Sequence, residues 1–355
     1  MQRFSLKIIF VLSLWFLVTT ALTGEYFWRW INTAHTVTTE NAVYNIPAGA
    51  SLYRVAHDLH EKKLLRWPRV WVWYARLMNE SDIKAGEYRL AEKESPISLL
   101  SRFQMGKTIQ YQITLVEGLT AKDFLQTLHN HRQIQPMLSM PQDIVDLRIE
   151  GIEEPFLEGW FFPDTYQFTR GDSDRSILLR AYKKMQDVLM HEWDQRAKDL
   201  PYDSPYEALI MASIVEKETG VAHEREEIAG VFVRRLNSGM RLQTDPTVIY
   251  GMGNNYNGNI TRKDLKTPTR YNTYTIKGLP PTPIAMPGKE AIHAALNPDS
   301  SDSLYFVARG DGTHYFSKTL EEHNRAVTKF QKQRVIDYRS SPNKKPIEAS
   351  PDLKK

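Results

Sequence analysis

The chain contains no cysteine among its 355 residues. This absence excludes thiol catalysis, disulfide bonds and zinc sites with cysteine ligands, and it leaves nothing to oxidise in an oxidising compartment. The sequence also has no block of five or more like charges, and its formal net charge is only +4. It therefore lacks the basic footprint of a nucleic-acid-binding protein, and we expect no nucleic acid among its partners.

Motifs for cofactors and metals are missing as well. No Walker loop, dinucleotide fingerprint or G-x-S-x-G elbow occurs. The HERE segment at residues 223–226 lacks the second histidine of a zinc protease, and the pairs His57/His60 and His129/His131 have no carboxylate at metal-binding spacing. We interpret these histidines as surface residues and predict neither a metal nor a cofactor.

One long hydrophobic run is present in a composition that is otherwise ordinary, with 41% hydrophobic and 25% charged residues. Residues 8–27 are long enough for a helix to cross the hydrocarbon core of a membrane. Arg3 and Lys7 precede the run and aromatic residues follow it, as is typical of a cytoplasmic start and an outer aromatic belt. We expect residues 1–30 to form a single-pass anchor in the inner membrane, with the rest in the periplasm. The alternative is a signal peptide that is cut among the small residues 19–24.

Residues 40–108 have the pattern of a small α+β module. A strand, a turn at Gly49 and a helix capped by Ser51 are predicted first, because apolar residues recur after Ser51 at helical spacing. Further helices are predicted to begin at Pro68 and Pro96, with a returning strand between them.

A larger mixed α+β domain is predicted over residues 109–338. It opens by repeating the earlier arrangement, with a strand, Gly118, the cap Thr120 and an apolar helix. Near its end, two strands flank a Gly-Asp-Gly turn at residues 310–312 and form a hairpin. Residues 339–355 are polar and interrupted by proline, which indicates a disordered tail. The fold class is therefore α+β, behind an N-terminal transmembrane helix.

The segment at residues 205–220 is the strongest helix in the chain, and it carries a carboxylate on its apolar face. At about 100° per residue, Glu218 falls in the arc of Met211 and Ile214. Burial and the negative end of the helix would raise the pKa of Glu218, as a general acid requires near neutral pH. An equally weighted alternative is a frayed helix end at which Glu218 reaches solvent.

Three later segments, at residues 239–253, 271–274 and 278–288, are rich in Tyr, Asn, Gln and Pro. Tyrosine faces, amides and a rigid proline-rich wall suit sugar rings, which are apolar on their faces and polar at their rims. Asp245 could be a second catalytic carboxylate. Its place before Pro246 is more typical of a helix cap, and we favour the cap.

The aromatic segment at residues 158–166 is open to two interpretations. It could be the wall of a substrate cleft or an aromatic corner of the core. We slightly favour the cleft wall.

Four segments in this order resemble the YceG-like, or MltG, family of endolytic murein transglycosylases: MASIVEKETG, RLQTDPTVIYGMG, YNTY and GLPPTPIAMPG. The resemblance covers nearly the whole chain. The start of the module at residues 40–108, Y-x-I-P-x-G-x-S-L, is similar to a LysM-type glycan-binding domain, with a long insertion around residues 64–78. The catalytic Glu of the family falls on Glu218, which the helical spacing also places on the apolar face.

The resemblance implies that Glu218 protonates the glycosidic oxygen between a MurNAc and the following GlcNAc. The carboxylate then accepts the proton of the MurNAc 6-hydroxyl, which closes a 1,6-anhydro ring without water. One carboxyl suffices for this route, whereas a hydrolase would need a second at about 5–10 Å, the role that Asp245 would fill. The residues expected to bind substrate are Gln243, Thr244, Asp245, Tyr250, Asn272 and Tyr274.

Two rival functions stay open. One is a hydrolytic muramidase on the same scaffold, and the other is a non-catalytic scaffold protein that binds peptidoglycan. For the lytic enzyme, a membrane-bound endolytic cutter could release nascent glycan strands and limit their length, and peptidoglycan synthases are its candidate partners.

Overall fold

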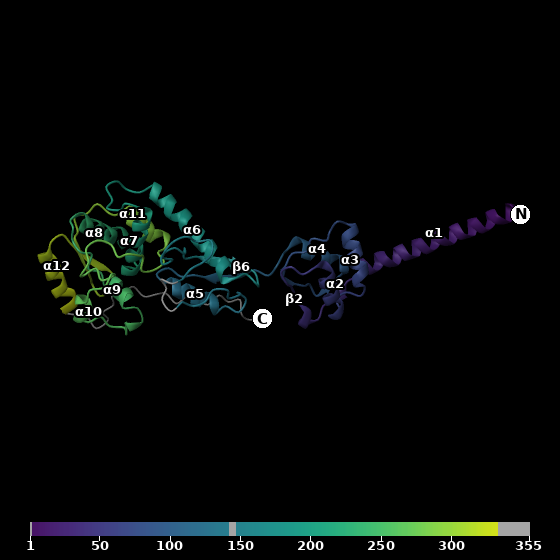
Figure 1. Ribbon diagram of the computed structural model, residues 1–355, viewed down its shortest axis with the longest axis horizontal. Coiled ribbons are helices and arrows are strands. Elements are labelled where there is room, and N and C mark those ends of the chain that lie inside the picture. Colours follow the sequence, from purple (N-terminus) through teal and green to yellow (C-terminus); the bar gives the residue numbers. More distant parts are fainter. Residues whose placement is uncertain (1, 142–146, 333–355) are drawn as a thin grey trace. The chain divides into compact units, whose positions relative to one another are not determined.

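The computed structural model describes residues 2–141 and 147–332 (Figure 1). The predicted tail at residues 339–355 lies outside the described residues. The chain divides into two compact units, and each has a hydrophobic core of its own. The first unit consists of Met1–Gln112, Gln133–Gln135 and Gln167–Asp172. The second unit holds the other described residues, and the mixed α/β character agrees with the predicted fold class.

The first unit contains four α-helices among its described residues. They are α1 (Gln2–Asn32), α2 (Leu52–Glu61), α3 (Pro68–Leu77) and α4 (Pro96–Met105), with the short 3-10 turn η1 (Thr39–Asn41). The strands form two-stranded antiparallel sheets. These pair β1 (His35–Thr36) with β4 (Lys93–Glu94), and β2 (Val43–Ile46) with β3 (Gly86–Arg89).

Helix α1 contains the predicted hydrophobic run. Its segment Ile8–Asn32 is long and apolar enough to cross a membrane and has no buried side chains within its most apolar stretch. The whole helix has 31 residues, so it is about 46 Å long at 1.5 Å per residue and exceeds the hydrocarbon thickness. A helix of this length that crossed a membrane would extend beyond it. In its last turn, Trp30 and Ile31 are buried in the core of the first unit.

The predicted caps of the first unit are present. The Ser51 side chain accepts a hydrogen bond from the backbone N–H of Arg54 at the start of α2. Ser95 forms a capping box with Ser98 at the start of α4. Gly49 has a φ of 74°, a left-handed conformation in which a side chain would be strained, and it makes the predicted turn between β2 and α2.

The second unit is mostly helical. Its α-helices are α5 (Ala121–His129), α6 (Asp174–Asp194), α7 (Pro205–Glu218), α8 (Arg225–Asn237), α9 (Asp245–Met252), α10 (Arg262–Lys266), α11 (Lys289–Leu296) and α12 (Leu320–Val327). Shorter turns are η3 (Ala222–Glu224), η4 (Gly253–Asn255) and the π-helix η5 (Thr328–Lys332). The strand pairs are β5 (Tyr111–Thr114) with β6 (Thr165–Phe168), and β7 (Tyr305–Ala308) with β8 (His314–Ser317).

Local signals again place several of these elements. Gly118 has a φ of 76° and Thr120 caps α5, so the predicted repeat of the strand, glycine and capped-helix arrangement is present. Strands β7 and β8 form the predicted antiparallel hairpin, in the register Tyr305↔Ser317.

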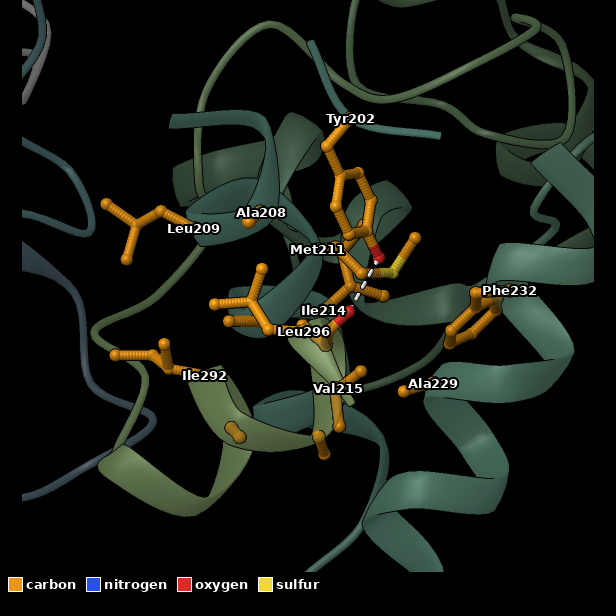
Figure 2. Packing of buried hydrophobic residues seen from close by; sticks show 14 of the residues in the cluster. Tyr202, Ala208, Leu209, Met211, Ile214, Val215, Ala229, Phe232, Ile292 and Leu296 are labelled. Atoms are coloured by element: carbon orange, nitrogen blue, oxygen red, sulfur yellow. Dashed lines mark hydrogen bonds between the residues drawn. The ribbon is translucent and has the colours of Figure 1, made fainter. Parts of the chain in front are cut away.

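The core of the second unit surrounds α7. Figure 2 shows Met211, Ile214 and Val215 of α7 packed with Ile292 and Leu296 of α11 and with residues of α8. The hydroxyl of Tyr202 donates a hydrogen bond to the carbonyl of Ala295 at 3.1 Å. Helix α7 is thus held on several sides along its length, which fixes the position of its last turn.

Two predictions about aromatic and histidine side chains are wrong. The side chains of Trp160, Phe161 and Phe162 are buried, so residues 158–166 form an aromatic corner of the core and not a cleft wall. His129 is not a surface residue, because it is half-buried and its Nε2 lies 2.9 Å from the carboxylate of the fully buried Asp174. Asp174 is 45 residues away along the chain, and sequence spacing could not reveal this pairing.

Candidate active site

The last turn of α7 places Glu218. Ser204 caps the start of the helix by accepting a hydrogen bond from the N–H of Glu207, and Pro205 occupies the first turn. The helix ends at Glu218, because Thr219 is extended with a φ of −141°. The Glu218 side chain is half-buried, as the apolar arc of α7 predicted, so it neither projects freely into solvent nor is sealed in the core.

Thr244 holds the Glu218 carboxyl. Its Oγ1 donates a hydrogen bond to Glu218 Oε1, and Thr244 itself is only 2% exposed. The backbone N–H of Thr244 donates to Thr273 Oγ1 at 3.1 Å, and Thr273 Oγ1 lies 2.8 Å from Thr247 Oγ1. The segments RLQTDPTVIYGMG and YNTY therefore meet beside the end of α7. No hydrogen bond to Glu218 Oε2 comes from the described residues, which leaves this oxygen available for a ligand.

Burial raises the pKa of Glu218 to about 7. The hydrogen bond from Thr244 opposes this shift by stabilising the charged form, nearby Asp245 adds to it, and the positive charge of Arg235 opposes it. A carboxyl with a pKa near 7 can hold a proton and also release one at neutral pH, which is what a group that acts first as acid and then as base requires.

Arg235 was not predicted as a site residue. It is 7% exposed, and its guanidinium donates to the carbonyl oxygens of Leu304 at 2.7 Å and Leu242 at 2.6 Å. Among the described residues no carboxylate forms an ion pair with it, so Glu218 receives part of its field. The sequence signal is the same as for Glu218, since Arg235 shares a helical face with the buried Ile228 and Phe232 of α8.

The two segments RLQTDPTVIYGMG and YNTY also carry the predicted site residues Gln243, Asp245 and Tyr274. Gln243 is exposed and has a φ of 55°, an uncommon conformation for a residue other than glycine. Asp245 is also exposed, and its Oδ1 accepts a hydrogen bond from the hydroxyl of Tyr274 at 2.7 Å. Burial and Asp245 raise the pKa of Tyr274, so this tyrosine is a neutral donor.

The cap predicted at Asp245 is off by one residue. Helix α9 begins at Asp245, its N-cap is Thr244, and neither residue's side chain accepts the capping hydrogen bond. The Thr244 hydroxyl is directed to Glu218 and the Asp245 carboxylate accepts from Tyr274. The start of α9 thus has residue types that could cap it, but their side chains form hydrogen bonds within the site and do not cap the helix.

Tyr250 contacts a second buried carboxyl. Its hydroxyl donates to Glu158 Oε2 at 3.0 Å, and Glu158 Oε1 accepts from the N–H of Ala121 at 2.9 Å. Burial raises the pKa of Glu158 to about 7, against the effect of these two hydrogen bonds. Tyr250 also packs edge-on against Tyr271, with ring centroids 4.8 Å apart. Its position is therefore fixed from two sides.

The side chain of Asn272 forms hydrogen bonds with backbone groups of the protein. It is fully buried, and its side-chain amide donates to the carbonyls of Asp264, Leu265 and Thr267. Its Oδ1 accepts from the N–H of Tyr274 at 2.9 Å. All of these partners are backbone groups, so Asn272 shapes the loop that carries Thr273 and Tyr274.

The proline-rich segment lies against α7 and is almost entirely buried. The N–H of Ile284 donates to Ser213 Oγ at 3.0 Å. Gly159 has a φ of 84°, and a Cβ on it would lie 2.5 Å from Pro283, so only glycine allows this close approach.

Glu216 also has a pKa raised to about 7, mainly by burial. The N–H of Gly288 donates to Glu216 Oε2 at 3.0 Å. Raised pKa alone therefore does not single out Glu218 among the carboxyls of this unit. The distinguishing feature of Glu218 is its position beside Thr244, Asp245 and the YNTY loop.

Comparisons with known proteins agree on one family. A family model described as the YceG-like family matches residues 44–329. A protein from Bacillus subtilis (strain 168) named endolytic murein transglycosylase is 33% identical over 304 residues, which cover 81% of this chain and 84% of the relative. A protein of the same name from Streptococcus pneumoniae (strain D39) is 29% identical over 316 residues, covering 79% of this chain and 57% of that relative. A crystal structure of a YceG-like protein from Listeria monocytogenes is 32% identical, with a TM-score of 0.48, and the match covers 80% of this chain and 97% of that one.

Proposed function

Because the chain belongs to the YceG-like family, we propose that it is an enzyme, a lytic transglycosylase that cleaves the glycan strands of peptidoglycan at internal bonds. The names of its relatives support this activity. The observation that carries the assignment of the catalytic residue is the half-buried carboxyl of Glu218, with a pKa near 7 and a hydrogen bond from Thr244. Glu218 is the proposed acid and base.

In the proposed reaction, protonated Glu218 donates its proton to the glycosidic oxygen between MurNAc and GlcNAc, and the bond from MurNAc C1 to that oxygen breaks. The resulting carboxylate accepts the proton of the MurNAc 6-hydroxyl, while the oxygen of this hydroxyl forms a bond to MurNAc C1. The product end is a 1,6-anhydro-MurNAc, no water is consumed, and Glu218 regains its proton. Thr244 fixes Oε1, so Oε2 is the oxygen that we expect to transfer the proton.

Substrate binding is proposed for the polar groups around this carboxyl. Gln243 and Asp245 are exposed beside it. Tyr274 and Tyr250, whose hydroxyls donate to Asp245 and Glu158, would contribute their rings. Thr244 would act on substrate only through Glu218. For Asn272 the buried amide supports a positioning role in the loop.

The wider setting is also part of the proposal. Helix α1 would anchor the chain in the inner membrane as a single pass, with the residues after it in the periplasm. Residues 40–108 would serve as a LysM-like glycan-binding module and residues 109–338 as the catalytic domain. An anchored endolytic enzyme of this kind would release nascent strands and limit their length, close to the synthases that make them.

Product mass is the test of this function. The full-length protein in detergent is incubated with purified uncrosslinked glycan strands, beside its Glu218→Gln and Asp245→Asn variants, and the products are analysed by mass spectrometry. We expect anhydro-MurNAc ends, lighter than hydrolytic ends by one water, from the wild type and from Asp245→Asn at a reduced rate. Glu218→Gln should give none.

Other outcomes select the rival functions. Hydrated reducing ends that disappear with both variants would make the enzyme a hydrolytic muramidase with Asp245 as its second carboxyl. Binding to glycan without any cleavage by the wild type, and unchanged in Glu218→Gln, would instead favour a non-catalytic scaffold protein.

A further inference from the structure

Helix α3 is apolar on its outer side as well as on its inner side. Trp71, Val72 and Ala75 are buried in the core of the first unit. On the outer side, Trp73 is 60% exposed and Leu77 is 64% exposed. A helix that buries one face in a soluble unit normally presents polar residues on the other, so this outer face requires an explanation.

The same helix packs against the end of α1. The ring of Trp67, the N-cap of α3, lies 5.4 Å from that of Tyr26 and 5.0 Å from that of Trp30. The ring of Tyr74 in α3 lies 5.8 Å from that of Phe27. These three aromatic contacts come from two successive turns of α1, so they fix α3 beside the outer end of the apolar run.

One surface hollow is lined by residues from both α1 and the start of α3, at the level of the apolar run. It is lined by Leu22, Thr23, Tyr26, Phe27, Trp67 and Val70. Val70 of α3 therefore shares a hollow with Leu22, which lies inside the apolar run of residues 8–27. If this run crosses a bilayer, the start of α3 lies at the depth of the outer interface.

The charges on α3 and just before it fit the same depth. Arg66, Arg69 and Arg76 are all exposed, and the Arg66 guanidinium lies 5.2 Å from the centre of the Trp67 ring. Tryptophan and arginine side chains together are typical of the headgroup region, where aromatic rings sit among the polar groups and arginines reach lipid phosphates from an apolar stem.

We propose that α3 is an interfacial helix whose outer face, defined by Val70, Trp73 and Leu77, lies in the headgroup region of the bilayer. The partner of this face is lipid, and the face is continuous with the membrane-spanning surface of α1. This inference rests on the membrane anchor of the proposed function. Its consequence is that the first unit is attached to the membrane at two places, and does not swing freely at the end of a single helix.

The absence of cysteine allows a direct test by single labels. Trp73→Cys and Leu77→Cys are introduced separately into the full-length protein and labelled with an environment-sensitive fluorophore. The protein is reconstituted into phospholipid vesicles without quencher, with lipids that carry a quencher near the headgroup, or with lipids that carry it deep in the acyl chain. The matched control is Met105→Cys, at the end of α4 in the same unit and 61% exposed. Leu17→Cys, 66% exposed within the apolar run, reports on the span itself.

We expect the headgroup quencher to lower the fluorescence at residues 73 and 77, the acyl-chain quencher to lower it at residue 17, and neither quencher to lower it appreciably at Met105. Quenching at Leu17 without quenching at 73 and 77 would overturn the interfacial role of α3 and leave the anchor intact. Absence of quenching at Leu17 would overturn the anchor, and this inference with it. Equal quenching at Met105 would mean that the whole unit contacts lipid, which also overturns a specific role of α3. Circular dichroism of each variant confirms that the unit is folded.

Discussion

At the scale of the residue, the activity of Glu218 should depend on its protonation. Its pKa is raised to about 7, and the proposed first step needs the protonated form. Above that pH the protonated fraction falls tenfold per unit, so we expect kcat/KM for glycan cleavage to fall with this slope. At pH 7 and below, Glu218→Gln should lower the rate by roughly 100- to 10,000-fold, because it removes acid–base catalysis. A rate that is flat between pH 6 and 9 would contradict this assignment.

Thr244 should affect the rate through the carboxyl that it contacts. Its hydrogen bond favours the charged form of Glu218. Thr244→Val should therefore raise the pKa of Glu218 further and move the falling limb of the pH–rate profile to higher pH. We also expect about a tenfold loss of rate, since a hydrogen bond to a charged group contributes about 1.5 kcal/mol or more. Thr244→Ser keeps the hydroxyl and should restore both. If Ser and Val behave alike, packing is the cause.

The sequence predicts some of these residues better than others. Glu218 could be found because a carboxylate on a buried helical stripe is conspicuous, and Arg235 carries the same signal on α8. The hydroxyl network from Thr244 to Thr273 could not be found, since it joins residues 29 apart through loop geometry. For Asn272, the residue type led to a prediction that its surroundings do not support. Its residue type suits a sugar amide, but its amide is used by three backbone carbonyls.

At the scale of the element, Glu158 joins α5 to α9 and should make stability depend on pH. Its pKa is raised from 4.5 to about 7 by burial, so between these values the folded state holds a proton that the unfolded state has lost. Stability then falls as pH rises through this window, by roughly 3 kcal/mol from this group, and levels off above it.

Glu158→Gln should remove this part of the slope, because an amide does not ionise and can still contact Ala121 and Tyr250. The measurement is denaturant unfolding of both proteins at pH 5 and pH 8, with the variant gaining stability relative to wild type at pH 8. The matched control is Glu153→Gln, at an exposed carboxyl nearby, which should leave the slope unchanged. A parallel response of wild type and Glu158→Gln would contradict the raised pKa.

Element starts are predictable where the cap is a local matter. Ser51, Ser95 and Thr120 all cap the helices that follow them, because an N-cap needs only a side chain and the N–H groups of the next turn. Asp245 obeys the same pattern in sequence, yet the tertiary hydrogen bond from Tyr274 takes its carboxylate. Strand partners such as β2 and β3 were also beyond prediction, since register depends on contacts across 40 residues.

At the scale of the whole molecule, the sequence predicts an anchor followed by α+β units. It does not predict that two short segments from the later part of the chain belong to the first unit. Gln133–Gln135 and Gln167–Asp172 belong to the first unit although they lie within the chain of the second. Here the Arg170 guanidinium pairs with the 5% exposed Glu87 at 2.5 Å. Composition and periodicity describe each stretch separately, so they assigned these residues to the larger domain.

The anchor and the first unit share one helix, and this should be visible in shortened chains. Trp30 and Ile31 of α1 are 7% and 0% exposed within the core of the first unit. A chain that begins at Gly24 keeps them, whereas one that begins at Thr33 loses them and opens this core. We expect the second chain to lose roughly 3–6 kcal/mol in the unfolding of its first unit, measured by calorimetry or denaturant titration.

A point variant separates the buried side chain from the helix that carries it. Ile31→Ala in the chain that begins at Gly24 should cost about 2–5 kcal/mol, because it leaves a cavity in a packed core. Trp28→Ala, at a 65% exposed position one turn earlier, should cost far less. If Ile31→Ala is also neutral, the end of α1 does not contribute to the core, and the anchor is a separate tether. If it is costly, a cut among residues 19–24 still leaves the first unit complete, so stability by itself permits either an intact anchor or a processed chain, and membrane association decides between them.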